Sequence, residues 1–375
     1  MNMTTSVVNE AWADEVWGKI VAKVERTSKR IGATFPYASA NGTYNNETND
    51  WWTNGFWPGL LWLIYKENEN VDLRDIAVSV ENMMDETLLG YEKLHHDVGF
   101  MWSLTSVAQY KLLGTEASKI RGLMAASHLA GRFNLKGQFI RAWNGADQQG
   151  WAIIDCLLNL PLLYWASETT NDPRFRHIAV AHADTVLREF IRPDGSSHHI
   201  VVFDPETGER IEARGGQGYS PDSAWARGTS WALYGMALSF TYTGHQRYLD
   251  AAKRVADFFI ANMPADSAPY WDFRAPAEPE TAFDTSAAAC AATGLLEIGR
   301  AVHEKEAHIY NDAAKRILIL LTEKYVSWGE EEEGILTMST ANFPKRTYVN
   351  VPIIYADYYY TEAIAKLRGR TELFW

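Results

Sequence analysis

Two kinds of helical segment alternate along this chain of 375 residues, and few folds accommodate such an alternation. Segments of the first kind place apolar residues three or four positions apart and carry charge on the other face, as solvent-facing helices do. Segments of the second kind are apolar or small nearly all round, which indicates helices buried on both sides. The first kind occurs at 10–31, 73–88, 116–133, 173–190, 246–263 and 307–326, and the second at 55–65, 99–113, 155–167, 227–242, 285–302 and 356–367.

This internal repeat predicts an all-α fold, an (α/α)6 barrel of six inner and six outer helices. Short connectors such as Leu113-Gly114 and Thr243-Gly244 lead from buried segments to the next solvated ones, and the longer connectors then share the opposite face. In one long connector, 200–202 and 210–211 flank a turn sequence, so we expect a small β-hairpin there and few other strands. No linker rich in Pro, Gly or Ser divides the chain, which predicts a single domain over 1–375.

The composition restricts the kinds of partner. A net charge of −12 argues against nucleic acid and anionic membranes, although local cations could still bind an anionic small molecule. No basic start followed by an apolar run opens the chain, so no signal peptide is predicted, and no window reaches the roughly 18 apolar residues of a membrane helix. The two cysteines, Cys156 and Cys290, form no disulfide framework. We expect a cytoplasmic protein that is a monomer or a weak homodimer.

Two carboxylates stand where buried segments begin. Asp97 follows two histidines and precedes an apolar helix, and Asp155 lies in an equally apolar stretch. Aspartate is a good helix N-cap, so either residue could be structural. Two carboxylates that face one cleft, however, raise each other's tendency to hold a proton, which keeps one of them protonated near neutral pH. The pattern predicts a general acid/base pair in which one of the two aspartates keeps its proton.

Aromatic residues interleaved with hydrogen-bonding groups gather in the long connectors. A pyranose offers an apolar face to a ring and hydroxyls at its rim, so such a set is typical of a sugar site. Any single tryptophan could equally be core packing, but we interpret the whole set as a carbohydrate cleft. The set comprises Asp50, Trp51, Trp52, Asn54, His95, His96, Asp97, Trp143, Asp155, His198, His199, Gln217, Trp225, Arg227 and Trp231.

A metal site is an alternative interpretation of the histidines. His95, His96, His199 and Asp97 could meet in space, but the chain has no HExxH motif and no paired cysteines. It also has no GxSxG elbow, Walker loop or Rossmann glycine pattern, so no motif of a serine hydrolase or a nucleotide-binding enzyme is present.

Five stretches of the chain carry the residues of one known family. They are Asp50-Trp51-Trp52-Thr53-Asn54-Gly55-Phe56-Trp57, His95-His96-Asp97-Val98-Gly99-Phe100, Ile154-Asp155-Cys156-Leu157-Leu158-Asn159-Leu160, Trp225-Ala226-Arg227-Gly228 and Asp357-Tyr358-Tyr359-Tyr360. Together, in order over nearly the whole chain, they resemble the unsaturated glucuronyl hydrolases of glycoside hydrolase family 88. The resemblance implies an (α/α)6 barrel without cofactor or metal. It also implies action on the Δ4,5-unsaturated uronic acid that polysaccharide lyases leave at the non-reducing end of oligosaccharides, by hydration of the vinyl ether.

The resemblance also implies roles for individual residues. Asp155 looks like the general acid and base, and Asp97 like the second acid, which holds the substrate and tunes its partner. For Asp155 to act as the acid, we expect its apolar surroundings and the charge of Asp97 to raise its pKa. The guanidinium of Arg227 would meet the substrate's carboxylate or an adjacent hydroxyl, unless this arginine is structural. Residues 339–351 match the family poorly and do not specify the sugar beyond the cleaved bond. The substrate contacts carried over are Trp52, His96, His199, Gln217, Trp225, Arg227 and Trp231.

Three other functions fit parts of the pattern. An unsaturated rhamnogalacturonyl hydrolase would use the same barrel and reaction with another leaving sugar. A sugar epimerase would use histidine pairs such as His95-His96 and His198-His199. A non-catalytic sugar-binding module would need no paired carboxylates, so it would keep its function when Asp155 is replaced by alanine.

Overall fold

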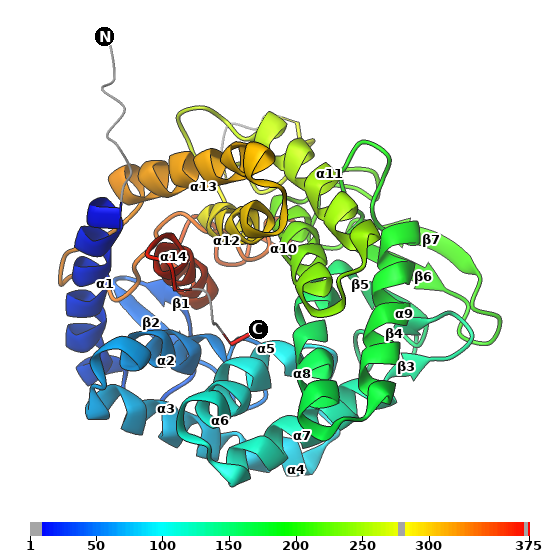
Figure 1. Cartoon of the computed structure of the whole chain (residues 1–375), viewed down its shortest axis with the longest axis horizontal. Helices are drawn as coiled ribbons and strands as arrows, with labels where there is room; N and C mark the ends of the chain where they lie inside the picture. Colours follow the sequence, from blue (N-terminus) through cyan, green and yellow to red (C-terminus); the bar gives the residue numbers. More distant parts are fainter. Residues whose placement is uncertain (1–9, 277–281, 371–373) are drawn as a thin grey trace.

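The computed structural model describes residues 10–276, 282–370 and 374–375, and these form two concentric rings of helices (Figure 1). The (α/α)6 barrel predicted from the sequence is confirmed. The outer ring consists of α1 (Glu10–Ile31), α3 (Val71–Met83), α7 (Glu116–Gly131), α9 (Pro173–Glu189), α11 (Gln246–Asn262) and α13 (Glu304–Lys324), with the short α4 (Asp85–Gly90) after α3. The inner ring consists of α2 (Phe56–Asn68), α5 (Val98–Trp102) continued by α6 (Ala108–Leu113), α8 (Leu160–Thr170), α10 (Ala226–Thr243), α12 (Thr285–Ala301) and α14 (Ile354–Leu367).

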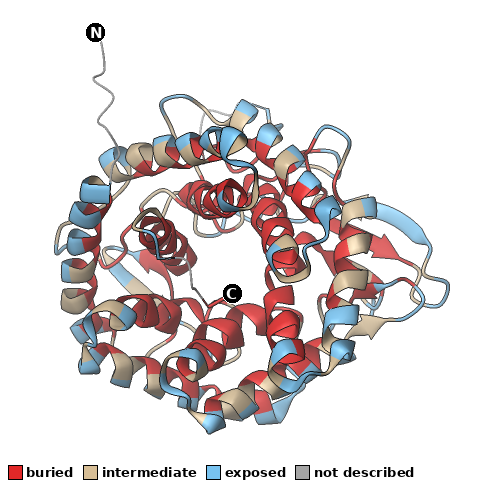
Figure 2. Ribbon diagram, viewed as in Figure 1, coloured by how far each residue is buried: buried red, intermediate tan, exposed pale blue. Residues whose placement is uncertain are grey.

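Burial follows the two sequence patterns. Inner helices are buried around their whole circumference, whereas outer helices bury one side and expose the other (Figure 2). In α12, every residue from Thr285 to Gly299 is buried, while α11 buries only the stripe that contains Tyr248, Val255 and Phe259. Among the described helices, none has the length and apolar character that crossing a bilayer requires.

Two inner segments differ from the continuous α-helices that the sequence predicted. The segment 99–113 contains a π-helical turn, Ser103–Val107, between α5 and α6. The segment 155–167 begins with a 3-10 turn, Ile154–Leu158, and α8 starts only afterwards, with Pro161 in its first turn. Proline is tolerated there because the first N–H groups of a helix have no intrahelical partner. Apolar periodicity does not distinguish these tighter and wider turns from an α-helix.

Short strands decorate the long connectors. The expected hairpin is confirmed as β6 (Ile200–Phe203) paired antiparallel with β7 (Arg210–Arg214). The other strands are few and short, as expected; β5 (Trp151–Ile153) extends the hairpin to three strands and ends directly before the 3-10 turn that contains Asp155. Two further pairs are β1 (Pro36–Ala40) with β2 (Thr43–Asn46), and β3 (Phe133–Asn134) with β4 (Phe139–Ile140).

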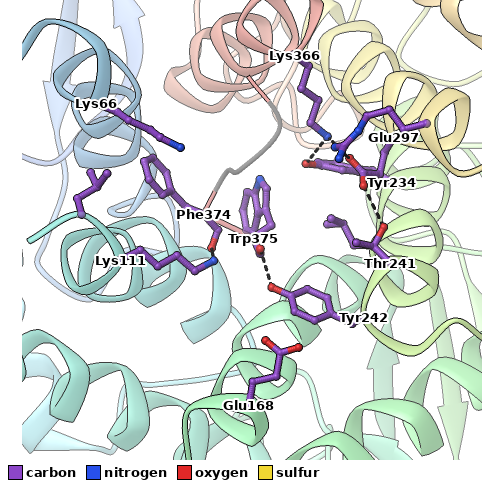
Figure 3. A pocket seen from close by; sticks show the side chains of 13 residues that line it. Lys66, Lys111, Glu168, Tyr234, Thr241, Tyr242, Glu297, Lys366, Phe374 and Trp375 are labelled. Atoms are coloured by element: carbon purple, nitrogen blue, oxygen red, sulfur yellow. Dashed lines mark hydrogen bonds and ion pairs between the residues drawn. The ribbon is translucent and has the colours of Figure 1, made fainter. Parts of the chain in front are cut away.

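At the end of the barrel with the short connectors, the last turns of the inner helices surround a cavity of about 580 Å³ (Figure 3). Phe374 and Trp375 lie in this region and are buried. The hydroxyl of Tyr242 donates to the Trp375 carbonyl at 2.7 Å, and the Trp375 indole N–H donates to Glu362 at 2.9 Å. The indole also stacks on Tyr359, at 6.1 Å between ring centroids. Trp375 therefore fills part of the barrel axis at this end, opposite the long connectors.

Candidate active site

Asp97 occupies the N-cap position of α5, but its side chain makes no capping hydrogen bond. Its carboxylate instead receives contacts from three neighbours. His95 Nδ1 lies 3.3 Å from Oδ2, His96 Nε2 lies 3.4 Å from Oδ1, and Asn159 Nδ2 donates to Oδ1 at 3.2 Å. The capping role considered from the sequence is thus not the role of this side chain.

These neighbours keep Asp97 ionised. Burial alone would raise its pKa, but His96, His95 and the hydrogen bond from Asn159 outweigh burial and lower the pKa below its ordinary value. Burial lowers the pKa of His96 to about 4, so this ring is neutral near pH 7. Near pH 7 the His96 ring therefore contacts the Asp97 carboxylate as a neutral polar group rather than as a cation.

Asp155 lies in the 3-10 turn that follows β5, and its side chain is 15% exposed. A close approach fixes this turn, because a Cβ on Gly235 of α10 would lie 2.4 Å from the Leu157 side chain. The Oδ1 atom of Asp155 has no hydrogen-bond partner among the described residues, and His199 Nε2 lies 3.9 Å from it. Asp155 thus has a buried carboxyl oxygen without a hydrogen-bond partner among the described residues, on the side of His199.

The opposite protonation state is favoured at Asp155. Burial, and then the negative charge of Asp97, raise its pKa to about 8, while Arg227 lowers it by less. This direction and both of its causes agree with the expectation from the sequence. A protonated carboxyl beside an ionised one is the arrangement that lets two aspartates divide the work of acid/base catalysis.

The tautomer of His199 follows from its contacts. The backbone N–H of Gln217 donates to His199 Nδ1 at 2.8 Å, and a backbone N–H can only donate. The contact between Nδ1 and the Gly215 carbonyl is longer, at 3.1 Å, and would require the proton on Nδ1. Burial lowers the pKa of His199 to about 3, so the ring is neutral and Nε2 carries its proton. This N–H has no partner among the described residues and lies on the side of Asp155.

Arg227 is buried, and its guanidinium is already hydrogen-bonded to acceptors of the protein. Its Nη1 donates to Asp284 and to the Thr340 carbonyl, both at 2.6 Å, while its Nη2 donates to Gln217 and to the Ala341 carbonyl, both at 2.7 Å. Among its nitrogens only Nε has no partner within the described ranges. Protein acceptors therefore take both terminal nitrogens that would meet a substrate carboxylate or hydroxyl, as in the structural alternative for this arginine.

The three tryptophans expected to contact the substrate differ in how far their rings are exposed. Trp52 is partly exposed and packs on Phe100 and Tyr355, at 5.5 and 5.4 Å between centroids. Trp225 is 4% exposed and lies 4.4 Å from the His199 ring. Trp231 is 0% exposed, so no face of its ring is open to a sugar in this conformation. Trp52 is the best placed of the three to stack on a ligand.

Sequence reasoning missed two residues at this site. Tyr355 is fully buried, its hydroxyl has no partner among the described residues, and Arg227 lies 5.2 Å from its ring. Asn159 contacts Asp97 directly, although it stood in a matching stretch only as one polar residue within an apolar run. In contrast, the structure does not bring His198 to the carboxylates, since its ring contacts the Pro221 carbonyl.

One group could hold a metal ion within the part of the chain that the structure describes. His95, His96 and Asp97 offer ligand atoms that all lie within 4.8 Å of one another. His199, which we considered as a further ligand, is not in this group. A neutral buried imidazole is a competent ligand, so the donor set fits a three-ligand cation site. This group overlaps the acid/base pair, so a cation here would compete for the carboxylate of Asp97.

The fold and the paired aspartates define a glycosidase, and comparisons with known proteins identify its family. The sequence model of Glycosyl Hydrolase Family 88 matches residues 24–366. The unsaturated glucuronyl hydrolase of Bacillus sp. (strain GL1) is 38% identical, over 96% of this chain and 97% of its own. The unsaturated chondroitin disaccharide hydrolase of Streptococcus pneumoniae is 34% identical, over 95% and 92%.

Solved structures agree with these relatives. The unsaturated glucuronyl hydrolase from Bacillus sp. GL1 has a TM-score of 0.93 at 38% identity, covering 97% of this chain and 99% of that one. An unsaturated glucuronyl hydrolase mutant from Streptococcus agalactiae, complexed with dGlcA-GalNAc6S, has a TM-score of 0.84 at 29% identity, covering 99% and 95%. The chain belongs to Glycosyl Hydrolase Family 88 and is an enzyme of the glycoside hydrolase class.

Proposed function

We propose that this enzyme removes the Δ4,5-unsaturated uronic acid from the non-reducing end of oligosaccharides produced by polysaccharide lyases. The observation that carries the proposal is the pair of aspartates, of which Asp155 holds a proton near neutral pH while Asp97 stays ionised. The names and substrates of the relatives support the class of substrate. No cofactor enters the reaction.

The reaction would begin at the double bond of the sugar. The carboxyl of Asp155 donates its proton to carbon 4, and the positive charge that develops at carbon 5 is shared with the ring oxygen. Water adds at carbon 5 and returns a proton to the carboxylate of Asp155, which restores the acid. The resulting hemiketal opens to a ketone and leaves a hemiacetal at carbon 1, which releases the remaining sugar. One water molecule is consumed.

Neighbouring residues would orient the substrate for this step. Asp97, as an ionised acceptor, would hold sugar hydroxyls and keep Asp155 protonated by its charge. The free N–H of His199 would donate to the ligand beside Asp155. Trp52 would stack on the apolar face of a sugar, since its ring is partly exposed. Arg227 would act by orienting Gln217, whose side-chain oxygen accepts its hydrogen bond, rather than by contacting the substrate with its own guanidinium.

Loss of ultraviolet absorbance tests the proposal, because hydration destroys the conjugated alkene. Purified enzyme would be given unsaturated disaccharides from glycosaminoglycan, gellan, xanthan and ulvan lyases. An unsaturated rhamnogalacturonan disaccharide belongs in the same panel, since faster turnover of it would favour the related rhamnogalacturonyl activity. Asp155→Asn is the matched inactive control. Absorbance that persists with every substrate would refute the proposal.

We also infer that the enzyme is a single-domain monomer or weak homodimer acting in the cytoplasm. The two cysteines support a reducing compartment, since both are buried free thiols. Sedimentation analysis of the purified protein would test the oligomeric state, and fractionation of the source cells would test the location.

A further inference from the structure

Three side chains that can bind a metal ion follow one another at the turn that leads into α5. His95 Nδ1 lies 3.3 Å from Asp97 Oδ2, and His96 Nε2 lies 3.4 Å from Asp97 Oδ1. Hydrogen bonds between a nitrogen donor and a carboxylate are usually shorter, at about 2.7–2.9 Å. Both imidazoles therefore stand farther from the carboxylate than a direct hydrogen bond prefers.

This separation matches the spacing of ligands around a tetrahedral ion. Zinc binds imidazole nitrogen and carboxylate oxygen at about 2.0–2.2 Å, so two ligand atoms of one tetrahedron lie about 3.3–3.6 Å apart. Neighbouring ligands of an octahedral ion with the same bond lengths would lie only about 2.8–3.1 Å apart. The two measured separations, 3.3 and 3.4 Å, fit the tetrahedral arrangement.

The third pair of ligand atoms, which joins the two imidazoles, requires a small movement. All three ligand atoms lie within 4.8 Å of one another, so this pair must close by up to about 1.5 Å to reach the tetrahedral spacing. The His95 side chain is 23% exposed and has room to turn, whereas His96 is 1% exposed. The exposed side of His95 also gives an ion access to the site.

Neighbouring groups support the ligands as a metal site requires. Metal-bound carboxylates are usually hydrogen-bonded by a further residue, and Asn159 Nδ2 donates to Asp97 Oδ1 at 3.2 Å. The backbone N–H of His96 donates to the Ala142 carbonyl at 3.1 Å, which anchors the turn that carries the three ligands. Three protein ligands leave the fourth tetrahedral position to water, as in open zinc sites.

We propose that His95, His96 and Asp97 form a zinc site through which Zn²⁺ inhibits the enzyme in competition with its substrate. The carboxylate of Asp97 cannot bind the ion and hold sugar hydroxyls with the same oxygens. The binding of zinc is independent of the proposed function, whereas the inhibition rests on it. Two imidazoles and one carboxylate select Zn²⁺ over Mg²⁺ and Ca²⁺, which prefer oxygen ligands.

Kinetics with an unsaturated disaccharide test the inhibition. Zinc at about ten times its dissociation constant should raise KM about tenfold and leave kcat unchanged, because the substrate displaces the ion. EDTA should restore the original KM, and Mg²⁺ at the same concentration should have no effect. Zinc that lowers kcat alone, or that has no effect, would overturn the proposal.

His95→Gln tests the ligand set. Glutamine is polar and of similar size but has no imidazole, so the affinity for zinc should fall by at least about 10–100-fold. Each variant is compared with its own zinc-free rate, which keeps changes in basal activity out of the comparison. His308→Gln, at an exposed position of α13, is the matched control and should be inhibited like the wild type. Equal zinc affinities of His95→Gln and wild type would place the ion elsewhere and overturn the proposal.

Cobalt absorption provides a measurement without turnover. Tetrahedral Co²⁺ absorbs visible light strongly, whereas octahedral Co²⁺ absorbs weakly. The wild type should bind a single Co²⁺ with the tetrahedral spectrum, Zn²⁺ should displace it, and His95→Gln should not show this spectrum at the same concentration. A weak spectrum of the octahedral type, or one that His95→Gln retains, would contradict the site. Enzyme that turned over no unsaturated disaccharide would refute the proposed function, while the cobalt spectrum would still decide whether these three residues bind a metal ion.

Discussion

Replacing Asp155 by asparagine should abolish turnover and at the same time stabilise the folded protein at alkaline pH. Burial and the charge of Asp97 raise the pKa of Asp155 from 3.8 to about 8, so the folded state keeps a proton that the unfolded state has already lost. Between these two pH values the folded state binds more protons, and its stability therefore falls as pH rises. Below the unfolded-state pKa this group has no such effect, and above the folded-state pKa the effect is constant.

The size of this effect follows from the two pKa values of Asp155. One unit of pKa difference corresponds to about 1.4 kcal/mol, so the accumulated loss is on the order of 5 kcal/mol once pH exceeds about 8. Asparagine has nearly the same shape and does not titrate. The free energy of unfolding of Asp155→Asn should therefore equal that of the wild type near pH 4 and exceed it increasingly up to pH 8.

Urea unfolding of both proteins from pH 4 to pH 9 would measure the difference. Asp250→Asn, at an exposed position of α11, is the matched control for the removal of one carboxylate from the surface. A difference between Asp155→Asn and wild type that does not change with pH would refute a proton held on Asp155. Retention of more than about a hundredth of the wild-type rate by Asp155→Asn would refute its role as the acid.

Four further outcomes are expected. Asp97→Asn should move the alkaline limb of the rate profile to a pH below about 8, because it removes the charge that helps to raise the pKa of Asp155; a limb that stays in place would contradict this coupling. Arg227→Lys should lower kcat/KM and the melting temperature together, because one ammonium cannot replace the four hydrogen bonds of the fork; unchanged kinetics would show that Gln217 needs no support from it. Trp375→Ala should cost about 3–5 kcal/mol in urea unfolding, as large aromatic truncations in cores do, and added indole should restore part of the loss by filling the space. Dialysis against a chelator should leave the rate unchanged, and a loss that zinc restores would instead favour the metal interpretation of the histidine pair.

The barrel could be predicted from the sequence because burial on both sides marks a helix over its whole length. In α12 the small and apolar residues run without interruption, whereas α11 repeats them on one face only. Strands such as β5, with three residues, are too short to leave an alternating pattern. The π-helical turn after α5 was missed for a related reason, since one added residue per turn barely changes the apolar face.

Side-chain access at the site depends on partners that lie far away in the sequence. The family resemblance implied that Arg227 contacts the substrate, but its acceptors are Asp284, 57 residues on, and the carbonyls of Thr340 and Ala341, 113 and 114 residues on. No local pattern indicates such contacts. Trp231 was likewise chosen for its residue type, and only the packing of three helices determines that its ring is covered.

The two aspartates show most directly what local sequence leaves open. Both stand at the start of apolar inner segments, so burial alone would raise both pKa values. The structure separates them by donors: Asp97 has an amide and two imidazoles against its carboxylate, whereas Asp155 has an oxygen without a hydrogen-bond partner among the described residues. Burial disfavours the charge at both positions, and only Asp97 has enough donors to overcome it. The difference in protonation between the two aspartates therefore depends on where the folded barrel places the Asn159 amide and the two imidazoles relative to the Asp97 carboxylate.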